Sequence, residues 1–236
     1  MITMIRTRSI FPMIVLCLLT TQYLSAQDCQ SLFPFEKGTV MGFTHYDGKD
    51  KVQSTSEQKI VIIDDNGSEG LTAQVEVSTS DAKGKESMSS TFKMICKDNI
   101  VYMDMSAAMP QLTEAFSSME VTMSGESLQI PSRLSVGQVL PDARMEVQAA
   151  SGGMNLIKMT IEITDRKVEG KETVTTPAGT FECYKIAQVA NTKMLISKSF
   201  RSVTWYADQV GMVKSENYDK KGKVESSSVL TKFKKG

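Results

Sequence analysis

The chain has 236 residues, and its 27 Lys and Arg are balanced by 27 Asp and Glu, with a single histidine. Nucleic acid and anionic membrane surfaces bind clustered basic charge, and this even balance predicts neither partner. The length beyond a short N-terminal leader is enough to bury the core of one all-β domain.

Residues 1–26 have the layout of a cleaved secretory signal peptide. Arg6 and Arg8 precede an apolar stretch of about ten residues, which is too short to cross a membrane as a helix, and Ser25-Ala26 offers a small-residue cleavage site. Loss of the leader leaves 25 basic against 27 acidic residues, a net charge of −2. We therefore expect residues 27–236 to form one exported domain, periplasmic, secreted or on the outer surface, that is not an integral membrane protein.

Three cysteines remain after the leader is removed, so one disulfide and one free thiol are expected in an oxidising compartment. The sequence does not determine the pairing. Cys29–Cys96 is favoured because a bridge there would tether the N-terminal segment. Cys183, within a strand pattern, then behaves as a small buried hydrophobic residue. Lipidation at Cys29 is disfavoured because Gln27-Asp28 precedes it.

The pattern Asp-x-Lys-x-Lys occurs three times, at residues 47–51, 81–85 and 219–223. In each copy the Asp side chain can bond the backbone two residues on, and the fourth position suits a left-handed conformation. Each copy is followed by a Ser-rich strand pattern. The repeats predict β-hairpin turns, and their lysines are interpreted as isolated charges that keep the tips soluble.

Apolar and polar residues alternate along most of the chain, as in 71–77 and 157–164. Such alternation predicts an antiparallel sheet with one solvated face. We expect an all-β fold of ten to twelve strands, curled into a strongly curved sheet or half-barrel meander. Residues 110–119 have helical spacing and predict one short α-helix on the concave face. Residues 131–142 predict a crossover loop.

Several turn and strand signatures are similar to those of the TapB-like group of exported bacterial proteins, whose function is unknown. They are Leu128-x-Ile130-Pro131, Val136-Gly137, residues 176–183, Trp205-Tyr206-Ala207 and residues 210–214. The resemblance covers essentially the whole mature chain. It implies a curved antiparallel half-barrel in the cell envelope of a Gram-negative bacterium, and it brings no catalytic residues.

No pattern typical of a catalytic, metal or cofactor site is present. His45 is the sole histidine, and no Gly-x-Ser-x-Gly motif accompanies it. Zinc would need convergent Cys and His side chains, which are lacking. Met103 and Met105 could bind Cu(I), but strand packing explains their spacing equally well. We therefore expect no enzyme activity, no cofactor and no metal.

Methionine is abundant around the expected helix, and it is common both in irregular cores and at adaptable apolar binding surfaces. Either use could apply here. The sharper hypothesis is an apolar groove, with these candidate ligand-binding residues: Met94, Met103, Met105, Phe116, Met119 and Trp205. The favoured function is a non-enzymatic envelope module that binds an apolar or lipid-like ligand. The alternatives are a structural or protein–protein interaction component that contacts an envelope protein and, more remotely, a hydrolase.

Overall fold

The protein is described by a computed structural model that covers residues 29, 31–103, 119–194 and 197–236. These residues form the strands β1 (Val40–Asp47), β2 (Val52–Asp65), β3 (Leu71–Asp81), β4 (Glu86–Lys97), β5 (Ile100–Met103), β6 (Glu120–Gly125), β7 (Leu128–Pro131), β8 (Ala143–Ser151), β9 (Met154–Thr176), β10 (Gly179–Lys193), β11 (Ser197–Ala207), β12 (Gly211–Tyr218) and β13 (Val224–Lys234), with a 3₁₀ turn η1 (Gly67–Glu69) after β2.

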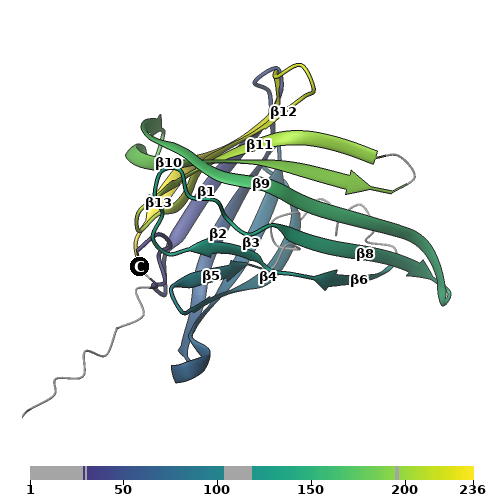
Figure 1. Cartoon of the computed structure of the whole chain (residues 1–236), viewed down its shortest axis with the longest axis horizontal. Coiled ribbons are helices and arrows are strands. Elements are labelled where there is room, and N and C mark those ends of the chain that lie inside the picture. The colour runs from purple at the N-terminus through teal and green to yellow at the C-terminus, as the bar shows by residue number, and fades with distance from the viewer. Residues whose placement is uncertain (1–28, 30, 104–118, 195–196) are drawn as a thin grey trace, which may run out of the picture.

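All thirteen strands belong to one antiparallel sheet, in the order β6-β8-β9-β10-β11-β12-β13-β1-β2-β3-β4-β5-β7 (Figure 1). β13 comes after the other strands in the sequence, yet it lies between β12 and β1 in the middle of the sheet. The all-β antiparallel fold expected from the alternation is confirmed.

The predicted curvature needs correction. The sheet is a single open one and not a strongly curled half-barrel, since β6 and β7 are its two end strands and no pairing joins them among the described residues. Only Glu126 and Ser127 separate β6 from β7 along the chain, so the two ends of the sheet lie near each other although the described residues do not pair there. The expected helix at 110–119 lies outside the described residues, apart from Met119. The described ranges contain no α-helix, and no helix in them could cross a membrane.

The three Asp-x-Lys-x-Lys copies form the same hairpin turn, as predicted. In each copy the Asp Oδ1 accepts the backbone N–H groups two and four residues later, at 2.8–3.0 Å. The fourth residue has a positive φ in all three: 59° at Asp50, 81° at Gly84 and 78° at Gly222. The turns at residues 47–51, 81–85 and 219–223 are called the basic tips below.

Two buried clusters of apolar side chains hold the sheet. The larger one includes Val75, Val101 and Ile161, so it draws on strands toward both ends of the sheet. The smaller one gathers side chains around Val203 and Trp205. Alternation explains the difference: Trp205 and Tyr206 are adjacent in β11, their side chains point to opposite faces, and they join different clusters.

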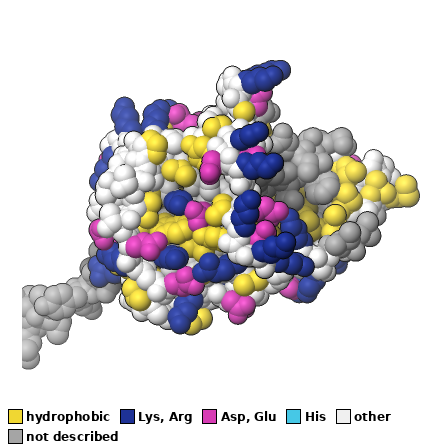
Figure 2. Space-filling view, turned by 90° about the horizontal axis from the view of Figure 1, so that it is seen from above, with side chains coloured by type: hydrophobic (Ala, Val, Ile, Leu, Met, Phe, Trp, Pro, Cys, Tyr) yellow, Lys and Arg dark blue, Asp and Glu magenta, His cyan; other side chains and the backbone are white. Residues whose placement is uncertain are grey.

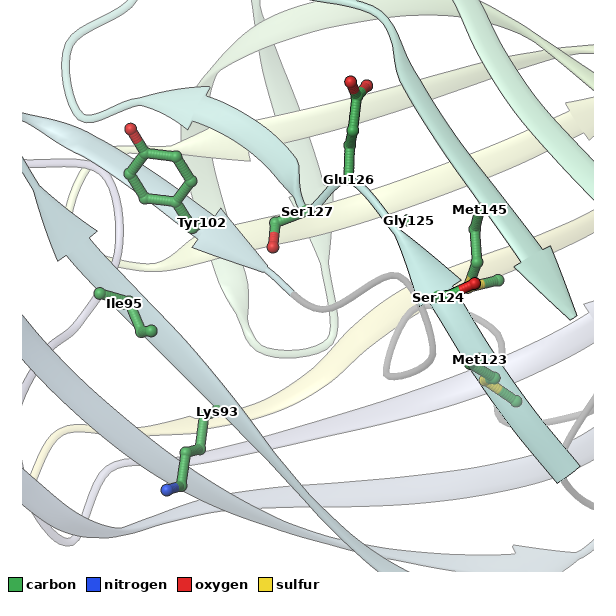
Figure 3. A pocket seen from close by; sticks show the side chains of 9 residues that line it. All are labelled: Lys93, Ile95, Tyr102, Met123, Ser124, Gly125, Glu126, Ser127 and Met145. Carbon is green, nitrogen blue, oxygen red and sulfur yellow. The ribbon is translucent and has the colours of Figure 1, made fainter.

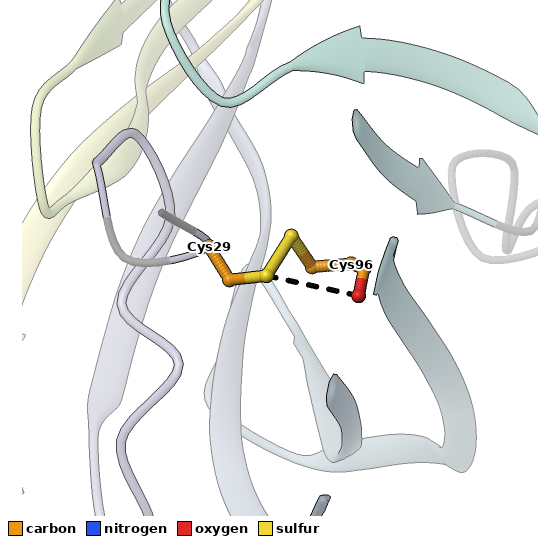
Figure 4. Close-up of a disulfide and its surroundings, with 2 residues drawn as sticks. All are labelled: Cys29 and Cys96. Atoms are coloured by element: carbon orange, nitrogen blue, oxygen red, sulfur yellow. Dashed lines mark hydrogen bonds between the residues drawn. A yellow bond between two sulfur atoms is a disulfide. The ribbon is translucent and has the colours of Figure 1, made fainter. Parts of the chain in front are cut away.

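The N-terminal segment is joined to β4 by a disulfide between Cys29 and Cys96, the pairing favoured from the sequence (Figure 4). Both cysteines lie in the larger cluster. Cys183 is a free, fully buried thiol, as expected, and burial raises its pKa to about 11. A thiol with such a pKa is almost entirely protonated at neutral pH and is a poor nucleophile.

The predicted crossover loop between β7 and β8 is held by a buried arginine. Arg166 of β9 is 1% exposed, and its guanidinium donates to the carbonyl oxygens of Gln129 and Pro141 and to Gln188 Oε1. It forms no ion pair with any described residue. Burial lowers its pKa, and this is opposed by Tyr206 and Asp142. Arg166 therefore connects the start and the end of the crossover to the body of the sheet.

Candidate functional site

One cavity lies between β4–β5 and β6–β8, near the two ends of the sheet. It has a volume of about 290 Å³, close to the smallest typical ligand pockets. Its lining residues come from two sides, as Figure 3 shows: Lys93 and Ile95 of β4 and Tyr102 of β5 on one, and Met123, Ser124, Gly125, Glu126, Ser127 and Met145 of β6, β8 and the β6–β7 link on the other.

The link between β6 and β7 determines this geometry. It consists of Glu126 and Ser127 alone, yet it joins the two end strands of the sheet. The chain can turn here because Gly125 has a φ of 142° and lies so close to β8 that a Cβ atom would be 2.3 Å from the Arg144 carbonyl oxygen. The Glu126 N–H donates to that same oxygen at 2.8 Å.

The two sides of the opening differ in chemistry. Met145 is buried in the larger core cluster, and Met123 packs against it. Ile95 is 38% exposed, and it lies on the face of β4 opposite to the buried Met94. Lys93 and Glu126 place one cation and one carboxylate at the rim. The cavity therefore leads from a polar rim to methionine side chains at the edge of the core.

Within the described residues, the candidates for the expected groove do not line this cavity. Met94 is buried in the larger cluster, Met103 packs against that cluster, and Met119 is half-buried; none of the three lines the cavity. Trp205 lies in the smaller cluster. Met105 and Phe116 lie outside the described residues.

Trp205 has its own polar surroundings. Its Nε1–H donates to Glu172 Oε1 at 2.5 Å, and its ring lies beneath two ammonium groups, Lys214 Nζ at 5.0 Å and Lys185 Nζ at 5.8 Å from the centroid. The side chain is only 5% exposed. These contacts satisfy the indole and cover its ring, so Trp205 contributes to the packing of β9–β12 and not to a groove wall.

His45 is held between two hydroxyl groups. Its Nδ1 is 2.8 Å from Ser228 Oγ and its Nε2 is 2.9 Å from Ser56 Oγ. A Ser–His relay also needs an acid that orients the ring, and here both ring nitrogens already contact serines. Burial lowers the pKa of His45. Within the described part of the chain, no three His, Cys, Asp or Glu side chains gather as a metal site would require.

No curated protein is similar enough to count as a match. An exported protein of Bacteroides fragilis NCTC 9343, named for a YmcC-like fold, is 26% identical with a TM-score of 0.72, covering 88% of this chain and all of that one. A lipoprotein of Parabacteroides distasonis ATCC 8503 is 24% identical with a TM-score of 0.74 over the same shares, which shows a common fold.

The family match covers most of the sheet. The model described as DUF3108-like matches residues 36–230, from just before β1 into β13. The resemblance seen in the sequence is supported in its coarser part, that of an all-β protein similar to a protein named as exported. The chain belongs to the DUF3108-like family.

Proposed function

We propose that the chain is an exported, non-enzymatic binding protein of the cell envelope, whose opening between β4 and β6 accepts an apolar or lipid-like ligand. Export is supported by the leader pattern of residues 1–26 and by the similarity to the Bacteroides protein named as exported. The Parabacteroides protein named as a lipoprotein shares the fold.

One observation carries the ligand proposal: the cavity of about 290 Å³ that leads from solvent to Met123 and Met145. Methionine side chains are flexible and polarisable, and they adapt to apolar chains of differing shape. Lys93 at the rim would meet the polar head of an amphipathic ligand, and an acyl tail would lie toward the methionines.

The test compares two isoleucines of similar exposure. Ile95, 38% exposed, lines the cavity, and Ile62, 41% exposed, lies on β2 away from it. Fluorescent fatty acid titrated into the exported protein should bind saturably. Ile95→Lys should weaken that binding at least about tenfold, since an ammonium group would then face the acyl chain; Ile62→Lys should not. An absence of saturable binding, or equal loss in both variants, would remove the proposal.

A second candidate function, a protein–protein interaction component, is favoured by a different surface. The turn regions at the far ends of β8–β9 and β10–β11 expose Met154 (67%), Leu156 (56%) and Met194 (51%). Exposed apolar groups of this kind mark protein contacts when they form a patch. In-cell crosslinking of the wild type and of Met154→Ser/Leu156→Ser tests it. A partner lost specifically in the variant supports this function, and identical crosslinking patterns contradict it.

A further inference from the structure

The pairing of the strands brings the three basic tips to the same end of the sheet. Ser226 of β13 pairs with Asp47 on one side and with Asn217 on the other, so the tips at 219–223 and 47–51 are neighbours. Ser54, just beyond the tip at 47–51, pairs with Asp81, where the tip at 81–85 begins. Strands lie about 4.8 Å apart, so successive tips are about 10 Å apart and the row is about 20 Å long.

The tip at residues 47–51 lies against the start of β13, directly after the tip at residues 219–223. A Cβ atom added to Gly48 would be 2.6 Å from the carbonyl oxygen of Val224, so the first hairpin turn packs against the strand that leaves the neighbouring tip. Figure 1 shows these two turns side by side above the sheet, beside the label of β12. The spacing of the row is thus determined by this backbone contact and by the hydrogen-bonded pairing of the strands.

The row carries an excess of positive charge with its cations toward solvent. Seven exposed lysines belong to the tips: Lys49, Lys51, Lys83, Lys85, Lys220, Lys221 and Lys223. Four aspartates accompany them, which leaves a net charge of +3. The Asp47 carboxylate faces its own turn, where hydrogen bonds from the Lys51 and Lys49 backbone lower its pKa.

The tip lysines differ from many lysines elsewhere on the sheet. Within the described residues none of the seven forms an ion pair, whereas Lys158, Lys193 and Lys232 each pair with a glutamate. Figure 2 views the molecule from above and shows many Lys and Arg side chains across this side, with Asp and Glu side chains among them. The ammonium groups of the tip lysines are therefore available to an anion outside the protein.

We propose that the row of basic tips is a docking surface for the anionic headgroups of a lipid membrane. The cations lie along a row of exposed turns and none of them lines the cavity between β4 and β6, which suits an extended anionic surface better than one small anion. The tips contain Gly, Asp, Ala and Lys without a large apolar side chain, so they contact headgroups and do not insert into the acyl region. A near-neutral chain thus carries a local basic field that its net charge conceals.

The experiment is cosedimentation of the exported protein with vesicles. Phosphatidylcholine alone is compared with phosphatidylcholine and phosphatidylglycerol at about 2:1, at low and at physiological salt. Wild-type protein should sediment with the anionic vesicles only, and less so at the higher salt, because ions screen the attraction. The variant K51Q/K85Q/K223Q removes one cation from each tip and should bind about a hundredfold less at low salt.

A matched variant keeps the change in total charge the same. K59Q/K97Q/K234Q removes three exposed lysines; Lys59 and Lys234 both pair with Val40, at the far end of β1 from the tips. It should bind like the wild type. Equal loss in the two triple variants with unchanged thermal unfolding, or no binding to anionic vesicles at low salt, would overturn the proposal.

A binding assay with a soluble polyanion distinguishes a membrane surface from a free polyanion as the partner. Binding of inorganic polyphosphate without binding to vesicles would assign the tips to a free polyanion and reject the membrane surface. The fatty-acid titration concerns the opening between β4 and β6 and involves none of these lysines. The two proposals can therefore fail separately.

Discussion

Replacement of Arg166 by Met should be among the most destabilising single changes in the described chain. Methionine is similar in length but donates no hydrogen bonds, so the carbonyl oxygens of Gln129 and Pro141 would lose their charged donor in a part-buried site. Each hydrogen bond to a charged group contributes about 1.5–3 kcal/mol. Methionine is neutral, so the variant no longer buries the Arg166 charge, and this offsets part of the loss. We expect a net loss of about 3 kcal/mol in the free energy of unfolding, or roughly 6–12 °C in Tm.

Urea unfolding followed by tryptophan fluorescence measures this loss, because Trp205 is the sole tryptophan and is buried. Arg144→Met is the matched control. Arg144 is 55% exposed and pairs with Glu146 and Glu162 on the surface, so its loss should cost less than about 1 kcal/mol. If Arg166→Met were as stable as Arg144→Met, Arg166 would not be holding the crossover loop in place.

Three further changes have defined outcomes. Gly222→Val should lower the free energy of unfolding by about 1–2 kcal/mol in urea titrations, because a β-branched residue is forced to a φ of 78° although the space around it is open; an unchanged midpoint would refute the turn geometry. Cys29→Ser/Cys96→Ser removes a link between residues 67 apart in sequence and should lower the free energy of unfolding by up to about 4 kcal/mol, because the unfolded chain gains entropy. The variant is compared with the wild type with and without reductant, and a variant as stable as the oxidised wild type would contradict the prediction. In the folded protein the pKa of His45 lies below its ordinary 6.5, so the unfolded chain binds a proton there more readily. The stability present above pH 6.5 therefore falls as the pH decreases below that value. The difference between the urea midpoints at pH 7.5 and pH 5 should be smaller in His45→Gln than in the wild type, and an equal difference would exclude His45 as the cause.

Local features of the fold were readable from the sequence because they depend on neighbouring residues. The alternation at 71–77 places Ala73, Val75 and Val77 in the interior, as the structure shows. The repeated Asp side chains and the residues of positive φ define the three hairpin turns through contacts within five residues. The two-residue alternation of apolar side chains therefore predicted the strands, and the Asp and positive-φ residues of the turns predicted the hairpins.

Features that depend on distant pairing could not be predicted. Alternation assigns Trp205 and Met94 to apolar faces, but it does not say which face of which strand meets which core, and the two lie in separate clusters. Arg166 lies within a polar run, Asp165-Arg166-Lys167, that gives no sign of burial. The lysines of the tips looked isolated because 30 to more than 100 residues separate the repeats along the chain.

The position of β13 has a consequence for how the protein reaches its folded state. Because β13 fills the place between β12 and β1, no strand pairing joins these two strands until residues 224–234 pair with β1, which precedes them by almost 200 residues. Such distant pairing is slow, since a very long loop must close before any contact rewards it. A chain built in this way cannot complete its central strand pairings until β13 is made.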